Sequence, residues 1–275
     1  MEEKPNFKVI EKIKHGGQKD VFLVEYNGSK MIYKVGKCNS INSLKRIIRE
    51  VNILRELDSA YFPKNYFFSY DEKNGTFEII EEYIEGQTLN KCGQNYNTEE
   101  TIAHLMINII EGMKILWSKE IVHRDLKPEN IIISKKNNKP VIIDLGIAKS
   151  LLEESYTKTI LPIGPCTIPY ASPEQLQNQK NIISCRSDFF SLGIIAMELY
   201  NRHNPFDPKW VGSGINIRDN IISGNKRIDE KDTIKSKEFI EIFMRCLEID
   251  PYNRYRKYTM LEDKLKNFIK EEIDE

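Results

Sequence analysis

The side chains most able to do chemistry are concentrated in one short segment of this chain. Residues 123–130 read His-Arg-Asp-Leu-Lys-Pro-Glu-Asn, and Asp144 follows fourteen positions after Asn130. Asp125 can orient or deprotonate an attacking hydroxyl, and Lys127 can neutralise charge on a group in transfer. Asn130 and Asp144 offer oxygen ligands of the kind that Mg²⁺ prefers. Together these side chains suit the transfer of a phosphoryl group from a magnesium nucleotide to a hydroxyl.

This segment resembles the catalytic and metal-binding loops of the protein kinases. Eight contiguous matches are followed, at the spacing of that family, by Asp144-Leu145-Gly146, in which Leu145 replaces the usual phenylalanine. Each piece alone is also typical of an ordinary turn or strand end. The resemblance implies an α+β, bilobal fold with a small β-rich N-lobe, one key helix and a larger helical C-lobe. It also implies ATP with Mg²⁺ or Mn²⁺ as cofactors.

A lysine and a glutamate upstream form a second candidate pair. Lys34 follows the apolar triplet Met31–Tyr33, and Glu50 comes sixteen positions later in a stretch of helical periodicity. In the protein kinases a strand lysine grips the ATP phosphates and a helix glutamate orients it, and the resemblance gives these roles to Lys34 and Glu50. The reaction needs a cation aimed into a dry cleft and held there by a carboxylate. Glu50 is preferred to Glu56 because it lies beside Val51 on the apolar stripe.

The phosphate-binding loop is the weakest part of the resemblance. With Val21 aligned, the three glycines of the kinase loop fall at Lys14, Gly16 and Lys19, and Gly17 lies next to the one that is kept. Glycine matters there because a Cβ atom holds the backbone amides away from the phosphates. Some bacterial protein kinases have a similar Gly-Gly-Gln-Lys pattern. We hypothesise that Lys19 lends an ammonium in place of a backbone contact; a polar hairpin turn is the ordinary alternative.

The hinge between the lobes is expected at residues 81–86, Glu-Glu-Tyr-Ile-Glu-Gly. The resemblance implies that backbone groups of Glu82 and Ile84 pair with adenine. It also implies a single kinase domain over residues 1–275, divided near residues 84 and 85. Most of the family has an apolar side chain where this chain has Glu81. A carboxylate behind the adenine is costly unless it is paired.

Two further features of the resemblance concern the acceptor. Lys127, two residues after Asp125, goes with serine and threonine acceptors in this family, and Thr167 stands where such members place a threonine against both. The resemblance therefore implies protein substrates phosphorylated on serine or threonine. Three other residues match structural supports of the family: Glu174 with Arg254, and Asp188.

Arg124 implies control by phosphorylation. An arginine before the catalytic aspartate, joined by Lys149 and Arg46, makes a cationic pocket suited to a dianionic phosphate. Acceptors are available in the segment that follows, and Thr157 and Thr159 have the most suitable distance from residues 172–174; the others are Ser155 and Tyr156.

The elements that must position these residues follow from periodicity. The first third reads as strands and hairpins, apart from an amphipathic helix predicted over residues 43–57. Helices dominate after residue 86, with N-terminal caps expected at Asn97 with Glu100 and at Thr259 with Glu262. A short hairpin is predicted from residues 131–133 and 141–143. Residues 147–170 are predicted to form a long functional loop.

Bulk composition narrows the remaining possibilities. The 275 residues include 41 basic and 41 acidic side chains, which gives no reason to expect nucleic-acid binding or a polybasic membrane patch. Five widely spaced cysteines, with no Cys-x-x-Cys pair, favour reduced thiols over disulfides or zinc. No apolar run suggests a signal peptide or a membrane span. We therefore expect a cytoplasmic monomer, with transient dimers for autophosphorylation.

Two alternatives compete with a protein kinase. The eroded glycine loop would also suit a pseudokinase, a kinase-shaped scaffold that binds partners without efficient phosphoryl transfer. A small-molecule kinase of the aminoglycoside or choline type shares the Asp-x-x-x-x-Asn spacing. Such enzymes typically lack the Arg-Asp-Leu-Lys-Pro pattern and the Glu174–Arg254 pair of this chain.

Overall fold

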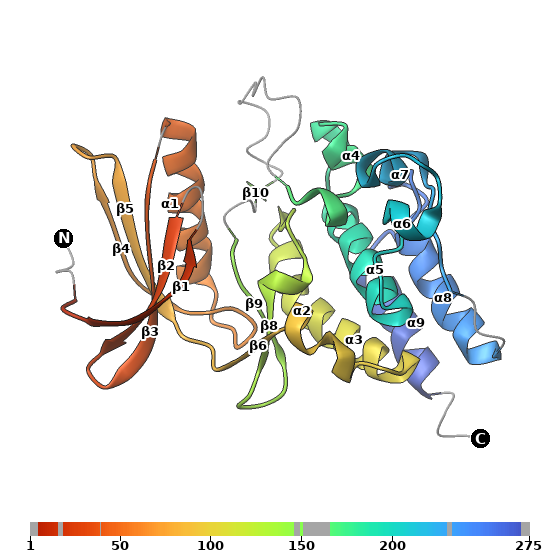
Figure 1. The fold of residues 1–275 in the computed structure, drawn as a ribbon, viewed down its shortest axis with the longest axis horizontal. Coiled ribbons are helices and arrows are strands. Elements are labelled where there is room, and N and C mark those ends of the chain that lie inside the picture. Colours follow the sequence, from red (N-terminus) through yellow and green to blue (C-terminus); the bar gives the residue numbers. More distant parts are fainter. Residues whose placement is uncertain are drawn as a thin grey trace.

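The chain folds into a β-sheet lobe and a larger helical lobe, which lie side by side (Figure 1). The computed structural model describes residues 5–15, 19–38, 40–145, 149–150, 166–229 and 233–270. The predicted α+β, two-lobed architecture is therefore confirmed.

The smaller lobe is built on one antiparallel sheet of five strands in the order β1-β2-β3-β5-β4. Asn27-Gly28 forms the predicted turn between the second and third strands, and both residues have positive φ. The strands are β1 (Lys8–His15), β2 (Lys19–Tyr26), β3 (Ser29–Lys37), β4 (Asn65–Asp71) and β5 (Thr76–Glu82).

Strand register brings three charged residues to the same face of this sheet. Lys34 on β3 lies opposite Val21 on β2 and Ile79 on β5. Lys19 and Glu81 stand two residues from those partners along their own strands. Because side chains alternate between the two faces of a strand, Lys19, Lys34 and Glu81 share one face. That face is the one that meets α1.

The helix of this lobe in the described ranges, α1 (Ile41–Glu56), begins two residues earlier than its periodicity predicted. The Ser40 hydroxyl accepts a hydrogen bond from the Ser43 backbone N–H at 3.1 Å and so caps the helix. Val51 packs with Phe77 and Ile79 of the sheet. This contact fixes the adjacent residue Glu50, which is 2% exposed, over the face that carries Lys34.

The helical lobe is centred on α3 and α5, which pack along each other with α8 and α9 on one side (Figure 1). Its helices in the described ranges are α2 (Leu89–Cys92), α3 (Glu99–Trp117), α4 (Pro173–Leu176), α5 (Cys185–Asn201), α6 (Pro208–Val211), α7 (Ile217–Ser223), α8 (Ile234–Cys246) and α9 (Tyr258–Lys270).

Both predicted helix caps were wrong by a residue or two. At α3 the cap is Thr98, which forms a reciprocal capping box with Thr101, and not Asn97 with Glu100. At α9 the helix already begins at Tyr258, so Thr259 lies inside its first turn. Adjacent polar residues compete for the cap position, and tertiary packing decides between them.

A short three-stranded sheet links the lobes to the catalytic loop, in the order β6-β8-β9. The β8–β9 hairpin was predicted. Gly86 at the start of β6 is required by packing, because a Cβ atom there would lie 2.2 Å from the carbonyl oxygen of Ile133. The strands are β6 (Gly86–Thr88), β8 (Ile131–Ser134) and β9 (Pro140–Ile142), and a separate pair joins β7 (Ile121–Val122) to β10 (Lys149–Ser150).

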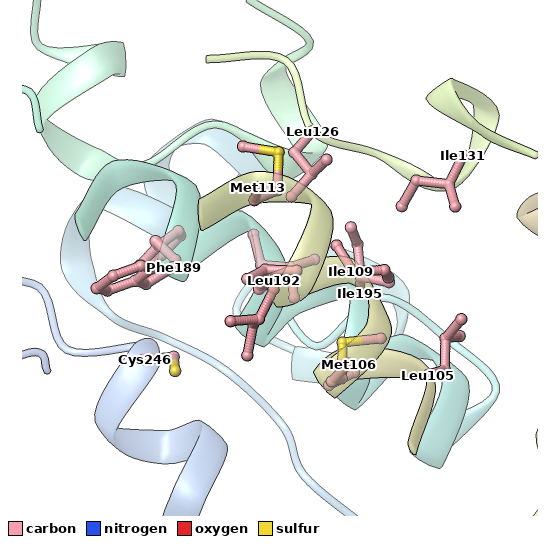
Figure 2. Packing of buried hydrophobic residues seen from close by; sticks show 14 of the residues in the cluster. Leu105, Met106, Ile109, Met113, Leu126, Ile131, Phe189, Leu192, Ile195 and Cys246 are labelled. Carbon is pink, nitrogen blue, oxygen red and sulfur yellow. The ribbon is translucent and has the colours of Figure 1, made fainter. Parts of the chain in front are cut away.

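The core of the helical lobe also anchors the predicted catalytic residues. Leu126, between Asp125 and Lys127, is fully buried near Met113 of α3 (Figure 2). Ile131 follows Asn130 and Leu145 follows Asp144, and both are buried in the same core. Burying a leucine or isoleucine side chain contributes about 1.5–3 kcal/mol, so each polar residue is held by a buried neighbour.

Candidate active site

In the sheet lobe, Lys34 lies between two buried carboxylates. Its Nζ is 2.6 Å from Glu81 Oε2 and 3.8 Å from Glu50 Oε1. All three side chains are buried, and the second oxygen of Glu81 and Oε1 of Glu50 have no hydrogen-bond partner among the described residues. Two acidic groups thus share the charge of one lysine. Burial raises the pKa of Glu50 against the opposing pull of Lys19 and Lys34.

Glu81 is the last buried residue of β5 and the first residue of the expected hinge. Its ion pair with Lys34 meets the condition under which a carboxylate behind the adenine is tolerated. The next residue, Glu82, donates its backbone N–H to Lys64 O at 2.8 Å. An adenine contact of Glu82 therefore has to use its carbonyl oxygen. Ile84 follows after the strand ends and is half-buried.

In the helical lobe, Asp125 is surrounded by donors. Its Oδ2 accepts from Lys127 Nζ at 2.7 Å and from Asn130 Nδ2 at 3.2 Å, and its Oδ1 accepts from the Thr167 backbone N–H at 3.1 Å. Lys127 also donates to the hydroxyl of Thr167. The structure thus brings Lys127 and Thr167, which were chosen from the sequence for acceptor specificity, against the same carboxylate.

Asp188 holds the backbone of the predicted catalytic loop through hydrogen bonds. This buried carboxylate accepts from the backbone N–H groups of His123 and Arg124 and from Trp117 Nε1, each at 2.9 Å. Arg124 adopts a left-handed conformation, φ 69°, which costs a non-glycine residue about 1–2 kcal/mol. Its carbonyl accepts from Gln175 Nε2 at 2.8 Å, so hydrogen bonds on both sides hold the strained residue in place.

Asp144 joins the two halves of the site. Its Oδ1 is 3.0 Å from Nζ of Lys19, the first residue of β2, so the ion pair links the lobes. Burial opposes ionisation of Asp144, but Lys19 and Lys34 outweigh it and hold the pKa of that carboxyl well below its usual range. Asp144 also has a left-handed backbone, φ 66°. Lys19, which the sequence left open between a turn and the site, lies in the site.

The residues predicted to hold metal fit Mg²⁺. Asn130 donates its amide nitrogen to Asp125 O at 2.9 Å, so its amide oxygen is the atom left to act as a ligand. Asp144 already attracts a cation, the ammonium of Lys19. Within the described ranges no three His, Cys, Asp or Glu side chains form a metal cage. One carboxylate and one amide suit an ion that takes its other ligands from phosphates and water.

Part of the predicted nucleotide site lies outside the described residues. Gly16 and Gly17 belong to this part, and the structure says nothing of them. Val21 is described; it lies on β2 opposite Lys34, on the face of the site.

A buried ion pair ties the chain after Thr167 to the helical lobe. Arg254 Nη1 and Nη2 donate to the two carboxylate oxygens of Glu174 at 2.8 and 2.9 Å. Both side chains are nearly inaccessible to solvent. Arg254 donates further to backbone carbonyls, including Arg186 O at 3.0 Å. The expected Glu174–Arg254 pair is therefore present.

The predicted phosphate pocket is only partly visible. The side chains of Lys149 and Arg46 and the acceptors Thr157 and Thr159, with Ser155 and Tyr156, lie outside the described residues. The structure adds Arg49 of α1, which the sequence analysis missed. Burial and then the nearby Arg124 guanidinium lower the pKa of Arg49. The position of Arg49 directly before Glu50 is the feature of the sequence that could have identified it.

A comparison with known families agrees with this geometry. The model of the protein kinase domain matches residues 7–265. The chain belongs to the protein kinase family. The kinase domain thus accounts for nearly the whole of this sequence.

Individual relatives come from distant organisms. The chain is 31% identical over 251 residues to the "Probable serine/threonine-protein kinase fnkE" of Dictyostelium discoideum, covering 86% of this chain and 17% of that protein. It is 27% identical over 271 residues to "Serine/threonine-protein kinase PrkC" of Bacillus subtilis, covering 94% and 40%. It is 30% identical over 194 residues to "Mitogen-activated protein kinase kinase 9" of Arabidopsis thaliana, covering 68% and 61%. The chain therefore spans less than two thirds of each of these relatives.

Proposed function

We propose that this kinase transfers the γ-phosphoryl group of ATP to serine or threonine hydroxyls of proteins. The observation that carries the proposal is the contact of Asp125 with Lys127, Asn130 and Thr167. This contact brings together a proton acceptor, a cation, a metal ligand and the threonine that is expected in kinases acting on serine or threonine. The named serine/threonine kinases among the relatives support the same substrate class.

Each residue has a task that follows from its position. Asp125 orients the acceptor hydroxyl and accepts its proton, because its carboxylate is fixed from three directions. Lys127, 2.7 Å from that carboxylate, neutralises charge that develops on the phosphoryl oxygens. Lys34 binds the α- and β-phosphates and is oriented by Glu50. Catalysis comes from alignment and charge neutralisation, without a covalent intermediate.

Magnesium would be held by Asn130 and Asp144, and it would supply positive charge that neutralises nucleotide phosphates. Asp144 is fixed for this role by the buried Leu145 that follows it. Asn130 is fixed by its bonds to Asp125 and by Ile131. Mn²⁺ has the same preference for oxygen ligands and should substitute.

The test is phosphoryl transfer by the Asp125→Asn variant. Asparagine keeps the size of the side chain but cannot accept the hydroxyl proton, so turnover on serine and threonine peptides should fall about 10²–10⁴-fold. Nucleotide affinity should change little, because Asp125 faces the acceptor. Radiolabelled ATP with wild type and variant measures the first quantity, and calorimetry measures the second. Equal, negligible turnover by both proteins would favour the pseudokinase alternative.

We also propose that phosphorylation between residues 146 and 166 activates the kinase. Arg124 and Arg49 support this, since two neighbouring guanidinium groups make a site for a dianionic phosphate. Thr157 and Thr159 are the favoured acceptors. Mass spectrometry of the protein after incubation with ATP should find phosphate in this segment; its absence there would contradict the proposal.

The remaining expectations concern the setting of the kinase. No helix in the part of the chain that the structure describes is long and apolar enough to cross a membrane. The division into lobes near residues 84 and 85 is supported by the end of β5 at Glu82 and the start of β6 at Gly86. A cytoplasmic monomer that dimerises transiently for autophosphorylation remains our proposal.

A further inference from the structure

Lys19 is the first residue of β2, yet its side chain pairs with a residue of the other lobe. Its ammonium reaches across from the sheet lobe to Asp144 Oδ1 at 3.0 Å, although the two residues are 125 positions apart. The side chain of Lys19 is 25% exposed and that of Asp144 is 35% exposed. The pair is therefore partly shielded from water but open enough for its partners to be exchanged.

The electrostatic surroundings explain why Lys19 turns inward. Register places Lys19, Lys34 and Glu81 on one face of the sheet, and Glu50 and Asp144 close the same space. The group thus contains two cations and three carboxylates. With more carboxylates than cations in this group, the ammonium of Lys19 is attracted toward it and pairs with Asp144.

Asp144 cannot serve Lys19 and a metal ion equally well at the same time. A divalent ion that binds Asp144 has to compete with the ammonium at Oδ1. The protein supplies few further ligands to such an ion. Asn130 is the other predicted ligand, and the described ranges contain no cage of His, Cys, Asp or Glu side chains. Nucleotide phosphates would change this balance, since they offer Lys19 another anion and the metal further ligands.

We propose that Lys19 makes metal binding and nucleotide binding interdependent, because its ammonium pairs with Asp144 until the phosphates of a nucleotide bind. The inference rests on the proposed function, since it assigns a second phosphate-binding cation to the same site. Lys19 is a positioning residue in this scheme. It weakens the binding of a divalent ion alone and strengthens the binding of a nucleotide. Linkage requires that each ligand then favours the other by the same factor.

Replacing Lys19 by methionine should move the two affinities in opposite directions. Lys19→Met keeps the reach of the side chain but removes the charge, so Mn²⁺ alone should bind several-fold more tightly. ATP in the presence of EDTA should bind several-fold more weakly. The factor by which Mn²⁺ and ATP promote each other should fall about tenfold, within the usual range of such couplings. A residue with a merely structural role would weaken both ligands or neither.

The measurements are made on the full chain. Free Mn²⁺ is followed by electron paramagnetic resonance, and metal-free ATP binding by calorimetry. Lys12→Met is the matched control, because Lys12 lies in the same sheet and makes a 3.0 Å pair with Asp20, away from Asp144. It should leave both affinities at the wild-type value. Lys19→Gln serves as a second neutral variant, and thermal unfolding verifies that each protein is folded.

The outcomes separate the two proposals. Wild type that binds Mn²⁺ with ATP, together with neutral Lys19 variants that bind Mn²⁺ alone no more tightly, would overturn the role of Lys19 only. Wild type that binds no nucleotide with either Mg²⁺ or Mn²⁺ would overturn the proposed function and this inference with it. Opposite shifts in the Lys19 variants, with none in Lys12→Met, would support both.

Discussion

The two halves of the candidate active site are held together by different forces. In the helical lobe, directed hydrogen bonds fix each group: Asp125 accepts three, and Asp188 accepts three from the loop and α3. In the sheet lobe, Lys34 and its two carboxylates interact mainly as charges, and two of the carboxylate oxygens have no hydrogen-bond partner in the described residues.

This difference matches the demands that the proposed reaction makes on each half. Proton abstraction needs a carboxylate at a defined angle and distance, which hydrogen bonds provide. Binding and release of a nucleotide need cations that can change partners, and charge pairs are less directional. We therefore expect substitutions in the helical lobe to cause large losses of stability or activity. Substitutions among Lys34, Glu50 and Glu81 should cause smaller losses, because another charged residue of that group can compensate. The next three predictions test that expectation.

The largest effect is expected for Glu174→Gln. Arg254 has one acidic partner in the described part of the chain, so the variant leaves a buried guanidinium without a counter-charge. Breaking such a pair costs about 3–5 kcal/mol in the free energy of unfolding. Denaturant unfolding measures the loss. The control is Glu85→Gln, whose partner Lys135 is exposed, and it should change stability by at most about 1 kcal/mol. Equal effects of the two variants would contradict the comparison.

An intermediate effect is expected for Thr167→Val. The variant removes the hydroxyl to which Lys127 donates but keeps the hydrogen bond from the backbone N–H of residue 167 to Asp125. A hydrogen bond to a charged group contributes about 1.5–3 kcal/mol, so kcat/KM for peptide substrates should fall roughly 10–100-fold. Steady-state kinetics on a serine peptide measure this, and Thr167→Ser should retain most of the activity. A serine variant as poor as the valine variant would show that the hydroxyl is not the cause.

The smallest effect is expected for Glu81→Gln. Lys34 loses its 2.6 Å partner but keeps Glu50, 3.8 Å away, as a second carboxylate. The free energy of unfolding should therefore change by less than about 1 kcal/mol, far below the cost of an unpaired buried charge. Denaturant unfolding of this variant beside Glu174→Gln gives the direct contrast. A loss of several kcal/mol would show that Glu50 cannot take over.

The sequence predicted most of the architecture because the strongest patterns are local. Alternating apolar strands, the Asn27-Gly28 turn and the helical stripe around Val51 each specify their own element. Helix ends were predicted less well. The choice of Thr98 over Asn97 as the cap of α3 depends on how the chain enters the helix, which periodicity does not contain.

The candidate site divides in the same way. Asp125, Lys127 and Asn130 are close in sequence, so their convergence could be expected from one loop. The Lys19–Asp144 and Lys34–Glu81 pairs join distant segments, and only the register of the sheet and the packing of the lobes bring them together. Arg49 escaped notice because a basic residue on a helix is usually a solvated one.

The position of Glu81 also bears on the design of inhibitors. Glu81 is buried, and one of its carboxylate oxygens has no hydrogen-bond partner in the described residues, so an apolar ring placed against it would offer that oxygen no donor and would lose affinity. A compound that places an amine there would gain a charge-assisted hydrogen bond instead. Selective ligands for this kinase domain should therefore carry a cation at the end that lies against Glu81.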